Sequence, residues 1–140
     1  MADSNIDLII AQVNAIMTAV TGISKVQSYE PLFLNNLNSA TIWWGGIPEI
    51  RDQSLGAKEV DYQVIVQINV FLASGVEAQT TLKDVVVSAM QALNVKPDLN
   101  STCLYHRITS VENIFDINRN GNLYATGMIT LIATKEELTL

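Results

Sequence analysis

The dominant hydrophobic pattern of the chain lies between residues 60 and 72, where apolar and polar positions alternate with a period of two. One face of this segment is entirely apolar, and it consists of Tyr62, Val64, Val66, Ile68, Val70 and Leu72. The opposite face is mixed, because amide side chains alternate there with Ile65 and Phe71. This pattern predicts a β-strand that covers a core with one face. The segment is longer than the usual strand of about 5–6 residues, so we expect its first half to extend beyond the domain.

Two other segments have apolar residues at the three- and four-residue spacing of amphipathic helices. The first covers residues 6–20, with Ser4 as the expected N-cap and Gly22 at the position of a C-terminal cap. The second has its apolar stripe from Leu82 to Leu93 and ends before Pro97. Both helices are expected to bury their apolar stripe against the sheet.

Four shorter stretches predict the remaining strands, at residues 25–29, 40–44, 108–117 and 123–133. The last two flank Asn120-Gly121, which is the strongest short signal for a hairpin turn. Small residues at 125 and 127 leave room for a helix against the sheet. The pair Gly45-Gly46 is expected to end the strand at 40–44. Of Trp43 and Trp44, one is expected to fill the core, and the other is an interface anchor or a partly covered surface residue.

The segment at residues 45–59 is rich in Gly, Pro, Ser and charge, and it separates two predicted strands. Connections of this length are uncommon in compact domains. We therefore expect a projecting hairpin or flexible arm at about residues 46–60, and a frayed tail at residues 135–140. The complete order predicts one α+β domain over residues 1–140, with a mainly antiparallel β-sheet, two amphipathic helices packed on one face and a long projecting β-hairpin or loop.

Composition restricts the classes of function. Charged residues make up 16% of the chain, against about 25% in ordinary soluble domains, which favours a surface covered by a partner over one made of uncharged polar residues. The net charge is −6 and the cations are scattered, which argues against nucleic-acid binding. No apolar run approaches the roughly 20 residues of a membrane span, and the N-terminus lacks a secretory signal, so we expect a cytosolic protein without membrane association.

Candidate chemistry is sparse, and we expect no enzyme, no cofactor and no metal. The single cysteine, Cys103, lies near the single histidine, His106, but an extended strand would point them to opposite faces. Glu49, Asp52 and Asp61 lie in or beside a polar segment, where solvated charges are the simpler interpretation. Residues 116–122 resemble a calcium loop but lack the acidic residue at its twelfth position, and a hairpin turn explains them more simply.

The order of the predicted elements over about residues 6–133 gives a further indication of function. It combines the N-terminal helix, the strand ATIWW, a polar segment with Arg51, Asp52, Lys58 and Glu59, a long strand ending in QINVFLAS, a helix at residues 80–93, and the hairpin RITSVENIFDINRNGNLYATGMITLIAT. This arrangement resembles the tail terminator proteins of long-tailed bacteriophages. The stretches INVFL and ITSV…NLYATGMITLIA are most similar to the corresponding strands.

The resemblance implies a structural virion protein that assembles in the host cytoplasm and forms a ring, usually a hexamer, at the head-proximal end of the tail. Such a ring ends polymerisation of the tail tube protein and presents a surface to the neck or head-completion protein. DNA passes through its lumen without specific binding, and an acidic lumen would suit this conduit. A neck or head–tail joining protein of similar fold is one alternative. A small ligand-binding or enzymatic α+β domain is another.

Two sets of residues are expected to form the interfaces of this ring. The arm is expected to contact the tube subunit or a neighbouring protomer, so that deleting residues 49–58 would leave a folded domain that no longer caps tubes. The outer sheet face is expected to join protomers, so that Phe71→Asp or Ile65→Asp would weaken the ring. The arm set is Ile47, Glu49, Ile50, Arg51, Asp52, Lys58 and Glu59, and the outer-face set is Gln63, Ile65, Gln67 and Phe71.

Overall fold

A computed structural model describes residues 5–27, 38–52, 57–71, 75–119 and 122–137 of the chain. The elements follow in the order α1 (Asn5–Thr18), β1 (Lys25–Gln27), β2 (Ser39–Asp52), β3 (Lys58–Phe71), α2 (Gly75–Asn94), β4 (Tyr105–Arg119) and β5 (Asn122–Glu137). Ser4, Leu72 and the predicted turn at Asn120-Gly121 lie outside the described residues. Every helix and strand predicted from the sequence has a counterpart in this order, and most are longer than predicted.

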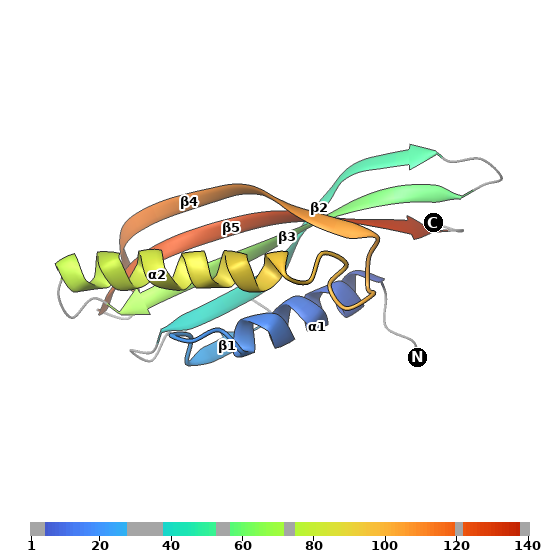
Figure 1. Cartoon of the computed structure of the whole chain (residues 1–140). Coiled ribbons are helices and arrows are strands. Elements are labelled where there is room, and N and C mark those ends of the chain that lie inside the picture. Colours follow the sequence, from blue (N-terminus) through green and yellow to red (C-terminus); the bar gives the residue numbers. More distant parts are fainter. Residues whose placement is uncertain (1–4, 28–37, 53–56, 72–74, 120–121, 138–140) are drawn as a thin grey trace.

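The strands form one five-stranded sheet in the order β1-β2-β3-β5-β4. Only β1 and β2 pair in parallel, and the three other pairs are antiparallel. Both helices lie on the same side of this sheet (Figure 1). Their contacts with the strands and with each other make a two-layer domain. The predicted α+β class, with a mainly antiparallel sheet and two helices on one face, is confirmed.

The core lies between the helices and the face of β3 that the alternation identified. Val64, Val66 and Ile68 are fully buried, as are Ile9 and Met17 of α1 and Leu93 of α2. On β5, Ala125, Ile129, Leu131 and Ala133 are also fully buried. Gly127 lies under α2, because a Cβ placed there would be 2.9 Å from Val86 Cγ2. The small residues of β5 therefore admit the helix, as predicted.

The prediction that Gly45-Gly46 ends a strand is wrong. The strand β2 continues to Asp52, and the register against β3 shifts on each side of Gly46, which marks a bulge. Gly46 has φ +112°, a conformation that favours glycine, so this residue bends the strand instead of ending it. A buried tryptophan was also predicted wrongly, because Trp43 is partly exposed and Trp44 is half exposed.

Beyond the bulge, β2, β3 and β5 continue together past the ends of the helices (Figure 1). We call this region the extension, and it comprises residues 49–52, 58–61 and 134–137. Asp52 pairs with Lys58, and Lys58 pairs in turn with Glu137. Residues 49–52 and 58–60 of the predicted arm are thus regular strand, residues 46–48 belong to the bulge within β2, and β5 continues three residues into the predicted frayed tail. Residues 53–56 lie outside the described residues, so a closed hairpin at the tip stays a prediction.

Candidate functional site: the extension and the two sheet margins

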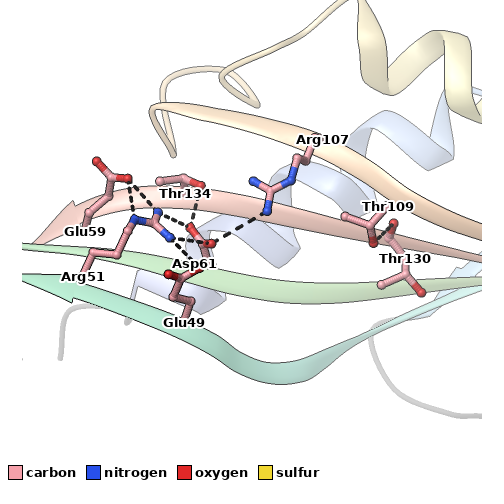
Figure 2. Close-up of polar contacts among 8 residues, drawn as sticks. All are labelled: Glu49, Arg51, Glu59, Asp61, Arg107, Thr109, Thr130 and Thr134. Atoms are coloured by element: carbon pink, nitrogen blue, oxygen red, sulfur yellow. Dashed lines mark hydrogen bonds and ion pairs between the residues drawn. The ribbon is translucent and has the colours of Figure 1, made fainter.

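The guanidinium of Arg51 connects two strands of the extension, β2 and β3. Arg51 on β2 donates from Nη1 to Asp61 Oδ2 at 3.0 Å and from Nη2 to Asp61 Oδ1 at 2.8 Å, which is a bidentate pair. Its Nε and Nη2 also donate to Glu59 Oε1, at 3.0 and 2.6 Å. Figure 2 shows Arg51 between these two carboxylates. Its Nη1 also lies 3.0 Å from Oε2 of Glu49, which is on the same strand. The cluster therefore crosslinks β2 and β3 through side chains.

Asp61 is the centre of this cluster. Its side chain is 2% exposed, and Thr134 of β5 donates a hydrogen bond of 2.7 Å to Asp61 Oδ1. Arg107 of β4 lies 3.9 Å from Asp61 Oδ2 (Figure 2), so four strands contribute to one site. A buried carboxylate requires such compensation because desolvation disfavours its charged form.

The hydrogen bonds determine the protonation of this cluster. Those from Arg51 lower the pKa of Asp61 below its usual value, against the opposing effect of burial, and Thr134 adds to the lowering. The same contacts, first with Asp61 and then with Glu59, raise the pKa of Arg51. The carboxylate of Asp61 is therefore ionised at neutral pH and serves as a fixed acceptor, with no proton to transfer in acid–base chemistry.

Three further side-chain contacts involve residues of the extension. Lys58 donates to Asp52 at the outer end, which lowers the pKa of the exposed Asp52 carboxyl. Glu137 of β5, which pairs with Lys58, accepts a hydrogen bond from Tyr62 Oη, and Asn5 Nδ2 of α1 donates to Glu137 Oε1 at 2.6 Å. Burial, followed by the bond to Glu137, raises the pKa of Tyr62. The last residue of β5 is thus tied to the start of α1.

The structure brings together some of the residues predicted for the arm. Glu49, Arg51 and Glu59 share one cluster, and Asp52 and Lys58 form a separate pair. Ile47 and Ile50 are exposed, as expected for contacts with another molecule. The sequence interpretation missed the central role of Asp61. The position of Asp61 could have indicated this role, because Asp61 is the one charged residue after Glu59 on the polar face of β3.

The outer sheet face is less available than predicted. Gln63 and Ile65 are half-buried, and the side chain of Phe71 lies outside the described residues. Gln67 is buried, and its Nε2 donates to Asn69 Oδ1 at 2.9 Å, which also accepts a bond of 2.9 Å from Thr126 Oγ1. In the single chain the Gln67 amide is therefore engaged in a hydrogen bond to Asn69, and an interface through this face stays a prediction.

Both margins of the sheet expose backbone. Within the described residues, no strand pairs with β2 on the side away from β3 after Thr41, and none pairs with the outer side of β4. Large apolar side chains are exposed beside each margin. Trp44, Ile47 and Ile50 lie on β2, whereas Leu104, Tyr105 and Val111 lie on or next to β4. Unpaired strand edges next to exposed apolar side chains are sites where another chain can add.

A groove of about 370 Å³ lies between α2 and the β4 margin. Its lining is mainly apolar and includes Val86, Val87 and Met90 of α2 and Val111 of β4. Val87 and Val111 are 45% and 43% exposed. The titratable lining residues of the groove are Lys83 and Glu112, and most of the remaining lining is apolar, so the groove fits an apolar side chain better than a reacting substrate.

The local pair Cys103 and His106 does not form a reactive site. Cys103 is buried in a turn before β4, and desolvation raises its pKa to about 11, which disfavours the thiolate. His106 Nδ1 lies 3.0 Å from the carbonyl oxygen of Pro97, and burial lowers its pKa. Within the part of the chain that the structure describes, no group of His, Cys, Asp and Glu residues could hold a metal ion.

Comparison with other proteins adds no family assignment. A scan against protein-family models finds no model that matches the chain, and a search of curated proteins finds no similar sequence. Among the described helices, none is both long and apolar enough to cross a membrane. The functional conclusion therefore rests on the geometry of the extension and the two margins, together with the resemblance in the layout of the sequence.

Proposed function

We propose that the protein is a structural virion component, a tail terminator that forms a ring at the head-proximal end of a phage tail tube. The observation that carries this proposal is the pair of unpaired margins on opposite sides of one sheet. A surface on one side that complements a different surface on the other side gives head-to-tail contacts, which close into a ring when the rotation permits. The low charge content of the chain supports extensive contacts between copies.

The extension suits contact with a neighbouring structural protein. It is acidic at its surface, because Glu49 and Asp52 are exposed, and it places Ile47 and Ile50 outside the helix layer. The Arg51 cluster crosslinks β2 and β3 in this region, and Val60 joins it to the apolar core. In the proposed assembly the extension contacts the tail tube protein or a neighbouring protomer, and the ring presents its other end to the neck. DNA passes through the lumen without specific binding.

The test is polymerisation of the purified tail tube subunit from the same phage, with and without this protein, followed by electron microscopy. We expect short tubes that carry a ring at one end when the protein is present. Unlimited tube growth despite bound protein would contradict the terminator function. Rings that bind tubes without limiting their length would favour a neck or head–tail joining role.

A variant separates the role of the extension from the stability of the domain. Deletion of residues 49–58 removes Arg51 and would leave the buried Asp61 carboxylate unpaired, so the deletion is combined with Asp61→Asn. We expect a folded domain that does not cap tubes. The matched control is Asp61→Asn alone, which keeps the full extension and is expected to cap. Normal capping by the deletion variant would show that the extension is not the contact.

A further inference from the structure

We propose that the groove between α2 and β4 binds an extended segment of another protein, which adds to the free edge of β4 as an additional strand. The bound segment has apolar side chains at two alternate positions and an acidic residue next to them. Its backbone pairs with Val111 and Asn113, and its apolar side chains enter the groove. This inference goes beyond the proposed ring and does not depend on it.

The direction of the backbone groups along β4 defines the free edge. Strand β4 lies at the margin of the sheet (Figure 1), and in the described part of the chain it pairs only with β5. The carbonyl oxygen of Glu112 is 3.7 Å from the position of a Cβ added at Gly127, so this carbonyl faces β5. Successive residues of an antiparallel strand direct their backbone groups to opposite sides. The N–H and C=O groups of Val111 and Asn113 therefore face away from β5.

These backbone groups restrict the occupant to an extended chain. Free N–H and C=O groups on alternate residues match the spacing of another strand, whereas a helix bonds its own backbone internally and cannot pair with them. Residues 109–113 of β4 are all exposed, so this edge is accessible. When a strand adds to such an edge, main-chain hydrogen bonds provide affinity and pockets for alternate side chains provide selectivity.

The groove provides the pocket for these alternate side chains. Val111 pairs with Ile129, which faces the helices, and Asn113 is two residues further along the same face of β4. Side chains that lie directly opposite each other in paired strands are on the same side of the sheet. Two side chains at alternate positions of the added strand therefore enter the groove and meet the apolar residues of α2. Binding would cover Val87 and Val111, which are about half exposed in the single chain.

One cation determines the charge preference of the groove. Lys83 of α2 is part of the lining, and it makes no hydrogen bond or ion pair with the residues that the structure describes. Glu112 also contributes to the lining, but the alternation of β4 places its side chain with Met128 on the face away from the helices. The next residue of α2, Asp84, does not line the groove. An acidic residue of the bound segment would therefore meet an unpaired cation.

The groove is separate from the exposed apolar residues at the start of β4. Leu104 and Tyr105 lie roughly 20 Å along the strand from Val111. The register shift between Ile108 and Ser110 divides these two parts of the margin. The start of β4 therefore stays available for contact with a neighbouring protomer while the groove holds the bound segment.

The test is the selection of peptides from a displayed library of random heptapeptides on the immobilised protein. The groove variant is Val87→Asp with Val111→Asp. The matched control is Leu8→Asp with Val95→Asp, which changes exposed apolar residues away from this groove. Circular dichroism establishes that each variant is folded before the enriched peptides are tested on it.

We expect the enriched peptides to share apolar residues at positions i and i+2, with an acidic residue next to them. The control should bind these peptides as the wild-type protein does, and the groove variant should bind them more than about tenfold more weakly. Lys83→Ala should weaken binding by about threefold, and Lys83→Arg should retain it. The proposal is overturned if no peptide is enriched, if the apolar residues recur at helical spacing, or if the groove variant binds normally.

Hydrogen exchange of backbone amides separates strand addition from the burial of side chains alone. When a synthetic copy of the most enriched peptide is bound, the amides of Val111 and Asn113 should gain protection. The amide of Glu112 faces β5 and should be protected in the free protein as well. Unchanged exchange at Val111 and Asn113 would overturn strand addition. These outcomes leave the ring to be tested separately by native mass.

Discussion

The two halves of β3 are stabilised by different kinds of interaction. The half that contains Val64, Val66 and Ile68 is covered by helices and packed in an apolar core. The half in the extension has Glu59 and Asp61 on one face, and these are held by Arg51 and Thr134. One continuous strand thus passes from a region stabilised by apolar burial to a region where directed polar contacts on one face are added to the burial of Val60 on the other.

This difference has consequences for how each region responds to change. Apolar burial is non-directional and depends little on pH or salt, and its loss scales with the volume removed. A network of ion pairs depends on each partner, and removing one leaves the others incompletely compensated. The stability of the core should therefore be insensitive to pH and sensitive to smaller side chains. The stability of the extension should be sensitive to pH and less sensitive to smaller apolar side chains.

The largest effect is expected in the core. Ile68→Ala removes a fully buried side chain from the covered half of β3 and should lower the free energy of unfolding by about 3 kcal/mol. Chemical denaturation followed by circular dichroism measures this loss. The matched control is Ile50→Ala on the exposed margin, where we expect a change of less than about 0.5 kcal/mol. Equal losses at both positions would contradict the claim that burial stabilises the covered half of β3.

A smaller effect is expected at the centre of the ion cluster. Asp61→Asn keeps the shape of the side chain but removes the charge that Arg51 and Thr134 contact, and it should cost about 2 kcal/mol. Because the pKa of Asp61 is lower in the folded state, the stabilisation is present above its unfolded pKa and is lost as pH falls through the folded pKa. Wild-type protein should therefore lose stability below about pH 4, and Asp61→Asn should lose less over that range. Identical acid profiles would contradict this role.

Because α2 packs closely on β5, we expect a modest loss of stability when a methyl group is added at Gly127. Gly127→Ala places a Cβ 2.9 Å from Val86 Cγ2, so the helix or the valine must move. We expect a loss of about 1 kcal/mol in the free energy of unfolding, as for mild overpacking. In the double variant Gly127→Ala with Val86→Ala, the clash is absent and the two losses should be less than additive. Strictly additive losses would show that the contact between residue 127 and Val86 does not cause the loss of stability.

The last prediction concerns acid sensitivity in the helix-covered region. His106 Nε2 is buried without a hydrogen-bond partner in the described structure, and its pKa is lowered by burial. Stability should therefore fall as pH drops below the unfolded pKa of about 6.5, because the unfolded chain binds the proton more readily. The variant His106→Gln should lack this decrease between pH 7 and 5. An unchanged slope in the variant would assign the decrease to another group.

The sequence predicted the elements that depend on periodicity and missed those that depend on tertiary contacts. Alternation in β3 and the apolar stripes identified the core face, because burial of a continuous face leaves a regular pattern. Gly45-Gly46 has the composition of a strand end, and only pairing with β3 turns it into a bulge. The turn after α2 places Leu99, Asn100 and Ser101 at positive φ without any glycine, and the sequence interpretation did not identify this conformation. The cluster around Asp61 required the register of three strands.

The most direct test of the central claim is the native mass of the purified protein across a dilution series, alone and bound to tail tubes. We predict a closed species near six times 15.3 kDa that does not change with dilution. A species whose mass grows continuously with concentration would indicate an open head-to-tail chain and not a ring. A monomer at every concentration, both in solution and on tail tubes, would contradict the ring and the function proposed from it.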